Sequence, residues 1–108
     1  MAKLNKIQII GRFGKDPEMT FKGQNGDVAV TKVSVAAERR RDKETVDWFN
    51  VVAFGQTAEF INQYGKKGRL VYLEGEMRNN RWEDDDRKTR DWWEIAVSEF
   101  QFLDFVEE

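Results

Sequence analysis

The sequence predicts a small all-β domain with one short helix. Apolar residues recur at every second position in several stretches, turn-forming residues separate these stretches, and one central stretch instead shows helical spacing. The chain has 108 residues, of which 40% are hydrophobic and 35% charged, enough for one modest core and too little for two. We therefore expect a single domain over residues 1–108.

The first two strands are expected at residues 4–13 and 28–37. Both ranges show the alternation of a strand with one buried face. Their alternating apolar residues are Ile7, Ile9, Phe13, Val33 and Val35. The glycine-rich stretch 22–27 predicts a turn before the second strand, and the basic stretch 39–45 predicts a loop after it.

The third strand is expected at residues 46–54, and its two faces differ in kind. The small apolar side chains of Val51 and Ala53, with Phe49, indicate the core face. The opposite face carries Trp48, Asn50, Val52 and Phe54. Two large aromatic side chains on an outer face suggest a binding surface, although an oligomer contact or a second core layer would also explain them.

Residues 56–64 break the alternation and predict the helix. Ala58, Ile61 and Tyr64 lie at helical spacing, Thr57 is the expected N-cap, and Gly65 is the expected end. A turn at 66–68 follows.

The last two strands are expected at residues 69–82 and 92–103, joined by a turn at 83–91. In the fourth strand, the residues with core parity are Val71, Leu73, Gly75 and Met77, and those with outer parity are Tyr72, Glu74, Glu76, Arg78, Asn80 and Trp82. In the fifth, Trp93 has the core parity of Ile95 and Val97, and Trp92 lies on the other face. Five strands with a helix between the third and fourth predict a Greek-key barrel of the OB type, with a small β-sandwich as the alternative.

Charge is distributed unevenly along the chain. The formal net charge is −2, but residues 1–81 carry 15 basic and 10 acidic residues, and residues 82–108 carry 3 basic and 10 acidic residues. A basic body can therefore bind an anion although the whole chain is acidic. The acidic run 83–86 is expected to be a solvated hairpin tip, because consecutive carboxylates in a turn point in divergent directions.

The missing residue types exclude most catalytic sites. Without Cys or His, the chain has no disulfide, no thiolate nucleophile, no zinc ribbon and no histidine base. We expect no enzymatic activity, no cofactor and no metal. The sequence shows neither a signal peptide nor an apolar run of ~20 residues, so we expect a cytoplasmic protein with no membrane partner.

Basic residues frame the two strands that expose aromatic side chains. The candidate phosphate-binding residues are Lys6, Arg12, Lys15, Arg39, Arg41, Lys43, Lys66, Lys67, Arg69, Arg78 and Arg81. Each cluster alone would be explained as a solvated turn. Together with aromatic rings, which stack on unpaired bases while cations follow the phosphates, they indicate binding of a single-stranded nucleic acid.

Four segments in register carry a family resemblance. Residues 5–18, with the ending Gly-Arg-Phe-Gly-Lys-Asp-Pro-Glu, and residues 48–55, 64–68 and 71–75 together resemble the bacterial single-stranded DNA-binding protein family. The resemblance implies an OB-fold that assembles as a homotetramer, a dimer of dimers with strand one at the subunit pairing. It also implies sequence-independent binding and protection of single-stranded DNA in replication, recombination and repair, in association with the nucleoid.

The resemblance also implies which residues stack on bases. Trp48, Phe54 and Trp82 match the family's stacking positions, and Arg40 stands where the family often has a further Trp. Arg40 is expected to stack through its guanidinium plane. For Trp92, contact with DNA and a cross-strand contact that clamps the hairpin remain alternatives.

One departure concerns protein partners. Family members usually continue into a flexible tail with an acidic tip and a terminal Phe that recruits partners, whereas this sequence ends at residues 103–108. Recruitment by that route is therefore not expected, and either a short family form or a truncated sequence would explain the ending. The rival functions are an adaptor of the replication machinery, such as the OB-fold primosomal proteins, an RNA-binding OB domain and an enzyme using the acidic hairpin.

Overall fold

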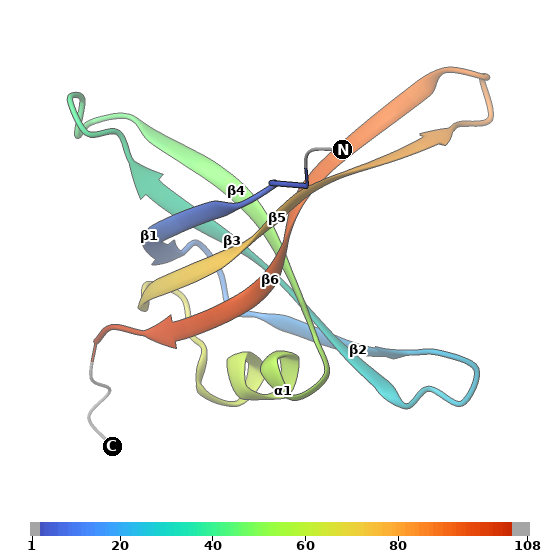
Figure 1. Cartoon of the computed structure of the whole chain (residues 1–108), viewed down its shortest axis with the longest axis horizontal. Coiled ribbons are helices and arrows are strands. Elements are labelled where there is room, and N and C mark those ends of the chain that lie inside the picture. Colours follow the sequence, from blue (N-terminus) through green and yellow to red (C-terminus); the bar gives the residue numbers. More distant parts are fainter. Residues whose placement is uncertain (1–2, 105–108) are drawn as a thin grey trace.

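The computed structural model describes residues 3–104, which form a closed β-sheet with one helix against it (Figure 1). The elements are β1 (Ile7–Phe13), β2 (Glu18–Lys22), β3 (Val28–Glu38), β4 (Val46–Phe54), α1 (Gly55–Tyr64), β5 (Leu70–Glu83) and β6 (Thr89–Phe102). The strand order is β1-β5-β6-β4-β3-β2, and pairing of β1 with β3 closes the ring. This order, with α1 between β4 and β5, confirms the predicted OB-type Greek-key barrel.

The described residues contain one strand more than the five predicted. β2 pairs with β3 from Glu18–Lys32 to Lys22–Val28, and the turn between them contains Gly23 and Gly26. Both glycines have positive φ, 103° and 63°, a conformation that other residues rarely adopt. β2 was not predicted because its side chains are mostly exposed, so it lacks the alternation of a half-buried strand.

Helix α1 begins earlier than its sequence signals indicate. The chain turns directly out of β4 at Gly55, which has a φ of 65°, and Phe54 is the N-cap without a side-chain hydrogen bond. The prediction of Thr57 as the N-cap is therefore wrong, because the glycine makes the turn without a side-chain acceptor. The predicted end is confirmed, since the Gly65 N–H donates to the Ile61 carbonyl at 2.7 Å.

The core lies inside the barrel and under α1. Its buried side chains come from every element of the closed ring and from the helix: Ile9, Phe13, Ala29, Val33, Val35, Val51, Ala53, Ala58, Ile61, Val71, Leu73 and Ile95. Thr31 is buried with them, and its hydroxyl donates to the Ala58 carbonyl at 2.7 Å, which satisfies the polar group and ties the helix to β3.

A bulge in β6 explains how both halves of the strand face the same core. Glu74 pairs with Glu99, whereas Gly75 pairs with Val97, so Ser98 has no direct partner on β5. This extra residue reverses the alternation, and Phe100 therefore packs on the core although its parity differs from that of Val97. The sheet comes so close here that a Cβ on Gly75 would overlap the Ala96 carbonyl.

Beyond the bulge, β5 and β6 continue as a two-stranded arm that projects from the barrel (Figure 1). We define the arm as residues 78–94. β6 begins at Thr89, three residues before the predicted start, so the tip turn is shorter than the predicted stretch 83–91. Residues 105–108, on which the expectation about the tail partly rests, lie outside the described residues.

Candidate nucleic-acid interface

The structure confirms the two predicted faces of β4. Val51 and Ala53 are buried in the core, whereas Trp48 is 60% exposed and Phe54 46% exposed on the opposite side. Val52 also lies on this opposite side but is buried, because it packs with Val30 and Ala96 in a small second cluster. We call this side of the sheet, away from the barrel core, the outer face.

The register between strands brings the other aromatic residues to the same face. Residues directly opposite each other in a sheet share a face. Ala96 pairs with Val52 on β4 and with Glu76 on β5, so the outer face continues from β4 across β6 to β5. Trp82 and Trp92 follow with the same alternation, and both are about half exposed.

Trp48 lies across its neighbours rather than standing out from the sheet. Its indole reaches Gly14, the residue that follows β1, so that a Cβ on Gly14 would overlap Trp48 Cζ3 and come within 2.8 Å of Cη2. The missing side chain at Gly14 therefore makes room for the ring. The Cζ3–Cη2 edge of the indole therefore lies against Gly14, and Trp48 remains largely exposed to solvent.

Phe54 borders a hollow at the other end of the outer face. This hollow has a volume of about 570 Å³ and lies between the N-terminal segment, β5 and β6. Lys3, Lys6 and Arg78 bring positive charge to it, and Glu74, Glu76 and Glu99 bring as many negative charges. An aromatic ring beside Lys and Arg is the combination that a stacked base with its phosphate requires.

Four of the predicted phosphate-binding residues make ion pairs, in which all partners are largely exposed except Glu74, whose side chain is 18% exposed. The pairs are Lys6 with Glu74 (3.6 Å), Arg39 with Asp47 (3.2 Å), Arg78 with Glu76 (2.7 Å) and Arg81 with Asp91 (2.9 Å). The carboxylate of Asp47 raises the pKa of Arg39, chiefly through their side-chain hydrogen bond. Exposed pairs of this kind are weak, so a phosphate can replace the carboxylate at little cost.

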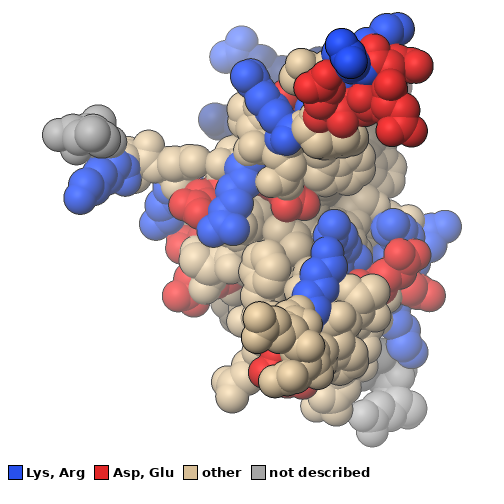
Figure 2. All heavy atoms as spheres, turned by 90° about the vertical axis from the view of Figure 1, so that its right-hand side faces the viewer, with Lys and Arg blue, Asp and Glu red and all other residues tan. Residues whose placement is uncertain are grey.

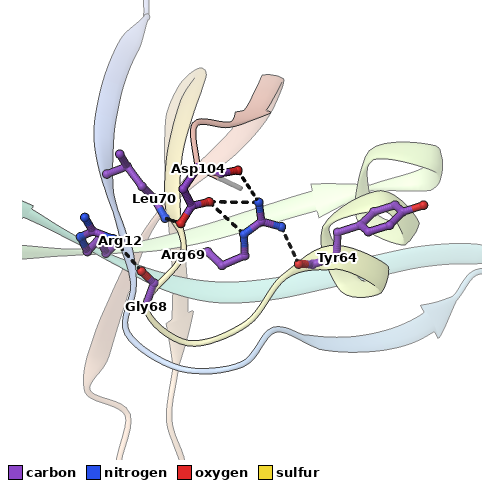
Figure 3. Close-up of polar contacts among 6 residues, drawn as sticks. All are labelled: Arg12, Tyr64, Gly68, Arg69, Leu70 and Asp104. Carbon is purple, nitrogen blue, oxygen red and sulfur yellow. Dashed lines mark hydrogen bonds and ion pairs between the residues drawn. The ribbon is translucent and has the colours of Figure 1, made fainter. Parts of the chain in front are cut away.

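Arg69 has a different environment from the other predicted residues (Figure 3). Its guanidinium bonds the carboxylate of Asp104 and the carbonyl of Tyr64, and its Cζ lies 3.9 Å from the centroid of the Phe102 ring. The Arg69 side chain is only 11% exposed. These contacts join the end of α1 to the residues after β6, and we therefore leave Arg69 out of the interface.

Asp104 completes this contact from the other side. Its carboxylate also accepts a hydrogen bond from the Leu70 backbone N–H at 3.1 Å (Figure 3). This bond, together with the Arg69 guanidinium, holds the pKa of Asp104 below its ordinary value.

The remaining predicted residues lie in exposed segments. Arg40, Arg41 and Lys43 belong to the loop between β3 and β4, and Lys66 and Lys67 to the loop between α1 and β5. Arg12 donates to the Gly68 carbonyl at 2.9 Å, and Lys15 borders a hollow together with Asn50 and Trp92. Lys32, which was not among the predicted residues, lines that same hollow from β3. Its only sequence signal is its alternation with Val33 and Val35.

The acidic residues concentrate at the tip of the arm (Figure 2). Asp84 organises the tip turn, since its carboxylate accepts hydrogen bonds from the backbone N–H groups of Asp86 and Lys88 and from Arg90. The bond from the Lys88 backbone is the main cause that lowers the pKa of Asp84. Arg87, Lys88 and Arg90 lie beside these carboxylates, so the tip keeps a small negative balance, which favours contact with phosphate at the base of the arm rather than at the tip.

Two further observations concern other kinds of site. Across residues 3–104, His, Cys, Asp and Glu form no group of three that could hold a metal ion. In the same part of the chain, no helix is both long and apolar enough to cross a membrane.

The fold and this face define an OB-fold domain whose outer face exposes aromatic side chains, with basic residues in the segments around it. The model of the single-strand binding protein family matches residues 4–103, and the chain belongs to that family. Its relatives include a single-stranded DNA-binding protein 1 of Xylella fastidiosa, 37% identical over 95% of this chain and 79% of the relative. A single-stranded DNA-binding protein of Thermotoga maritima is 38% identical over 96% of this chain and 77% of the relative.

A solved structure agrees with the family assignment. The structure described as a Plasmodium falciparum SSB complex with ssDNA superimposes with a TM-score of 0.79 at 31% identity. The match covers 96% of this chain and 98% of the other.

Proposed function

We propose that this protein binds single-stranded DNA without sequence preference and protects it during replication, recombination and repair, as a cytoplasmic protein associated with the nucleoid. The observation that carries the proposal is the outer face, where Trp48, Phe54, Trp82 and Trp92 are exposed on one continuous surface. Membership in the single-strand binding protein family and the names of the relatives support it.

In this proposal the aromatic rings and the cations have separate tasks. Bases stack on Trp48, Phe54 and Trp82, with contributions of about 1–3 kcal/mol per base, and Trp92 and the guanidinium of Arg40 add contacts. Phosphates displace the carboxylates from exposed cations such as Arg78 and Lys6. Each phosphate neutralised adds about −0.7 to the slope of log K against the logarithm of the salt concentration, where K is the binding constant. We call this slope the salt slope. Neither contribution depends on base identity.

Duplex DNA does not fit this mechanism, because paired bases cannot present their flat faces to the indoles. The protein has no reaction to catalyse, and no cofactor is part of the proposal. The whole chain acts as one OB-fold unit.

The subunits assemble as a homotetramer in which β1 takes part in the pairing. The apolar side chain of Ile10 on β1 is 60% exposed, and it lines a hollow of about 390 Å³ together with Val46 and Leu70. An exposed apolar patch on a small domain suits contact with another subunit. Light scattering is expected to report about four times the chain mass of 12.7 kDa, and a monomer would contradict the assembly. Ile10→Lys is expected to lower the mass.

Titration with poly-dT tests the binding mechanism. Tryptophan fluorescence should be quenched on binding, poly-dT should compete far better than duplex, and poly-U shows whether RNA is bound equally well. Trp82→Ala is expected to weaken binding about fivefold or more at an almost unchanged salt slope. Arg78→Ala is expected to reduce that slope by less than one unit. If Trp82→Ala leaves the affinity for long poly-dT unchanged, the stacking assignment is wrong.

A further inference from the structure

A split in the sheet between β4 and β6 forms a cleft next to the outer face. Within residues 3–104, the two strands pair only at Val51–Ile95 and Val52–Ala96. They cross there and diverge toward their N-terminal ends, β4 toward the loop before it and β6 toward the tip of the arm (Figure 1). The cleft between them has a volume of about 410 Å³, within the range of about 300–1,000 Å³ of small-ligand sites.

Aromatic side chains from both strands line this cleft. β4 contributes Trp48 and Phe49, and β6 contributes Trp92 and Trp93. By the alternation of the strands, Trp48 and Trp92 belong to the outer face, and Phe49 and Trp93 to the side facing the barrel. The cleft therefore leads from the outer face toward Trp93.

Trp93 is the residue whose position the sequence did not predict. Its alternation with Ile95 indicates a core side chain, yet Trp93 is 53% exposed whereas Ile95 is fully buried. The reason is that Trp93 lies on the arm, where the barrel has ended and no described strand covers it. Together with Trp48 and Trp92 it forms an exposed aromatic patch, and such patches mark contact surfaces.

Polar and charged groups lie at the cleft in an arrangement that suits a nucleotide. The Asn50 side chain donates to the Trp93 carbonyl at 3.3 Å, so its amide group spans the cleft. A hollow of about 150 Å³ adjoins the cleft at Asn50 and Trp92, and Lys15 and Lys32 line it. Neither lysine has an ion pair among the described residues, so both are available to a phosphate.

Two of the acidic residues at the cleft and the adjoining hollow bond neighbouring side chains. Asp91 in the cleft pairs with Arg81, and Glu94 in the adjoining hollow accepts a hydrogen bond from the Asn80 side chain at 2.8 Å. The charge of Asp91 is therefore compensated by Arg81, whereas Glu94 keeps its charge and is held by a neutral donor. The remaining acidic group, Glu18, lies beside Lys15 and Lys32 in the hollow.

We propose that this cleft receives one unpaired base of the bound strand, which leaves the row stacked on the outer face and stacks against Trp93. The inference rests on the proposed function. A base suits the cleft because the walls are flat rings, the Asn50 amide can meet a base edge, and the lysines beside it attract the backbone. An extended peptide or a second copy of the chain, bound to the unpaired edges of β4 and β6, would gain less from these groups.

Two substitutions of Trp93 test the inference. Trp93→Leu keeps an apolar side chain against Phe49 and Met77 but removes the stacking surface. It is expected to weaken poly-dT binding about fivefold or more at an unchanged salt slope. Trp93→Tyr keeps a ring and is expected to bind nearly as tightly as the native protein. Tyr64→Leu is the matched control, since Tyr64 lies on α1 and is exposed to a degree similar to Trp93. This variant is expected to bind poly-dT as tightly as the native protein.

A second measurement keeps the test decisive if Trp93→Leu folds poorly. Addition of saturating poly-dT should quench less fluorescence in Trp93→Tyr than in the native protein, because one indole in contact with a base is missing. If saturating poly-dT removes as much fluorescence from Trp93→Tyr as from the native protein, the inference is overturned. Thermal melting of each variant reports whether the fold is intact.

The outcomes separate the inference from the function on which it rests. If Trp82→Ala weakens binding and Trp93→Leu does not, the cleft is not a base site while the proposed function stands. If Trp93→Leu changes the mass in light scattering and leaves DNA binding unchanged, the cleft is an interface between copies and the inference is wrong. If the native protein does not bind poly-dT, the proposed function itself fails.

Discussion

Gly14→Ala offers a direct test of how the Trp48 indole is positioned. The added Cβ would lie 2.8 Å from Trp48 Cη2 and closer still to Cζ3, whereas ordinary contacts are 3.4–4 Å. The ring must therefore retreat by about 0.6 Å at Cη2 and by more at Cζ3. The other close neighbour, Ser34 Oγ at 3.1 Å, belongs to a short side chain that can rotate.

The expected loss is larger in binding than in stability. The φ of Gly14 lies outside the left-handed region, so Ala fits the backbone, and the Gly14 N–H can keep its 2.9 Å bond to the Ser34 carbonyl. Because Trp48 is largely exposed, its ring can swing into solvent, and the free energy of unfolding should change by less than about 1 kcal/mol. A displaced ring loses much of a stacking contribution of about 1–3 kcal/mol, which corresponds to about fivefold weaker binding.

A double-mutant cycle checks the physical cause. Poly-dT affinities are measured for Gly14→Ala, Trp48→Ala and the double variant, with thermal melts of each. If Gly14 acts through the indole, Gly14→Ala should have almost no effect once Trp48 is already Ala. If Gly14→Ala lowers the poly-dT affinity equally with Trp48 present and with Ala at position 48, this would falsify the claim that Gly14 positions the indole.

Three further predictions concern the scaffold. Arg69→Ala should lower the free energy of unfolding by about 1–3 kcal/mol in urea denaturation and leave DNA binding of the folded protein unchanged; a pure loss of affinity would instead make Arg69 a phosphate contact. The folded-state pKa of Asp104 lies below its ordinary value of 3.8, so its contribution to stability is present above that value and is lost as the pH falls through the folded-state pKa. The stability difference between the native protein and Asp104→Asn should thus be constant above about pH 5 and shrink below it in pH-dependent melts, and a difference independent of pH would contradict this. Gly75→Ala should destabilise by about 1–3 kcal/mol or more, because its Cβ meets the Ala96 carbonyl rather than a movable side chain; an unchanged melting temperature would show that the barrel can relax there.

Much of the fold could be read from local patterns. The alternation of Val51 and Ala53 against Trp48 and Phe54 predicted the two faces of β4, because one buried face imposes a period of two on any strand. The helix was found because Ala58 and Ile61 are spaced for one buried stripe. β2 was missed for the converse reason, since a strand with mostly exposed side chains carries no such period.

The candidate site was predicted less completely, and two basic residues show why. Arg69 and Arg78 are alike in sequence context, each in or beside the same strand. Only the structure places Arg69 against Phe102 and Asp104, which are more than 30 positions further along the chain. Arg78, in contrast, stays exposed beside Glu76. Whether a cation is committed to the fold depends on such distant partners.

The sequence by itself determined five of the six strands and the place of the helix between them, the outward direction of Trp48, Phe54 and Trp82, and the family resemblance, because these follow from local periodicity and short motifs. Tertiary structure alone decided where the core stops. Trp93 has the parity of a core residue but lies past the end of the barrel, and the Ser98 bulge restores core contact to Phe100 on the opposite parity. Burial depends on what packs against a residue from elsewhere in the chain, and the period of a strand cannot report that.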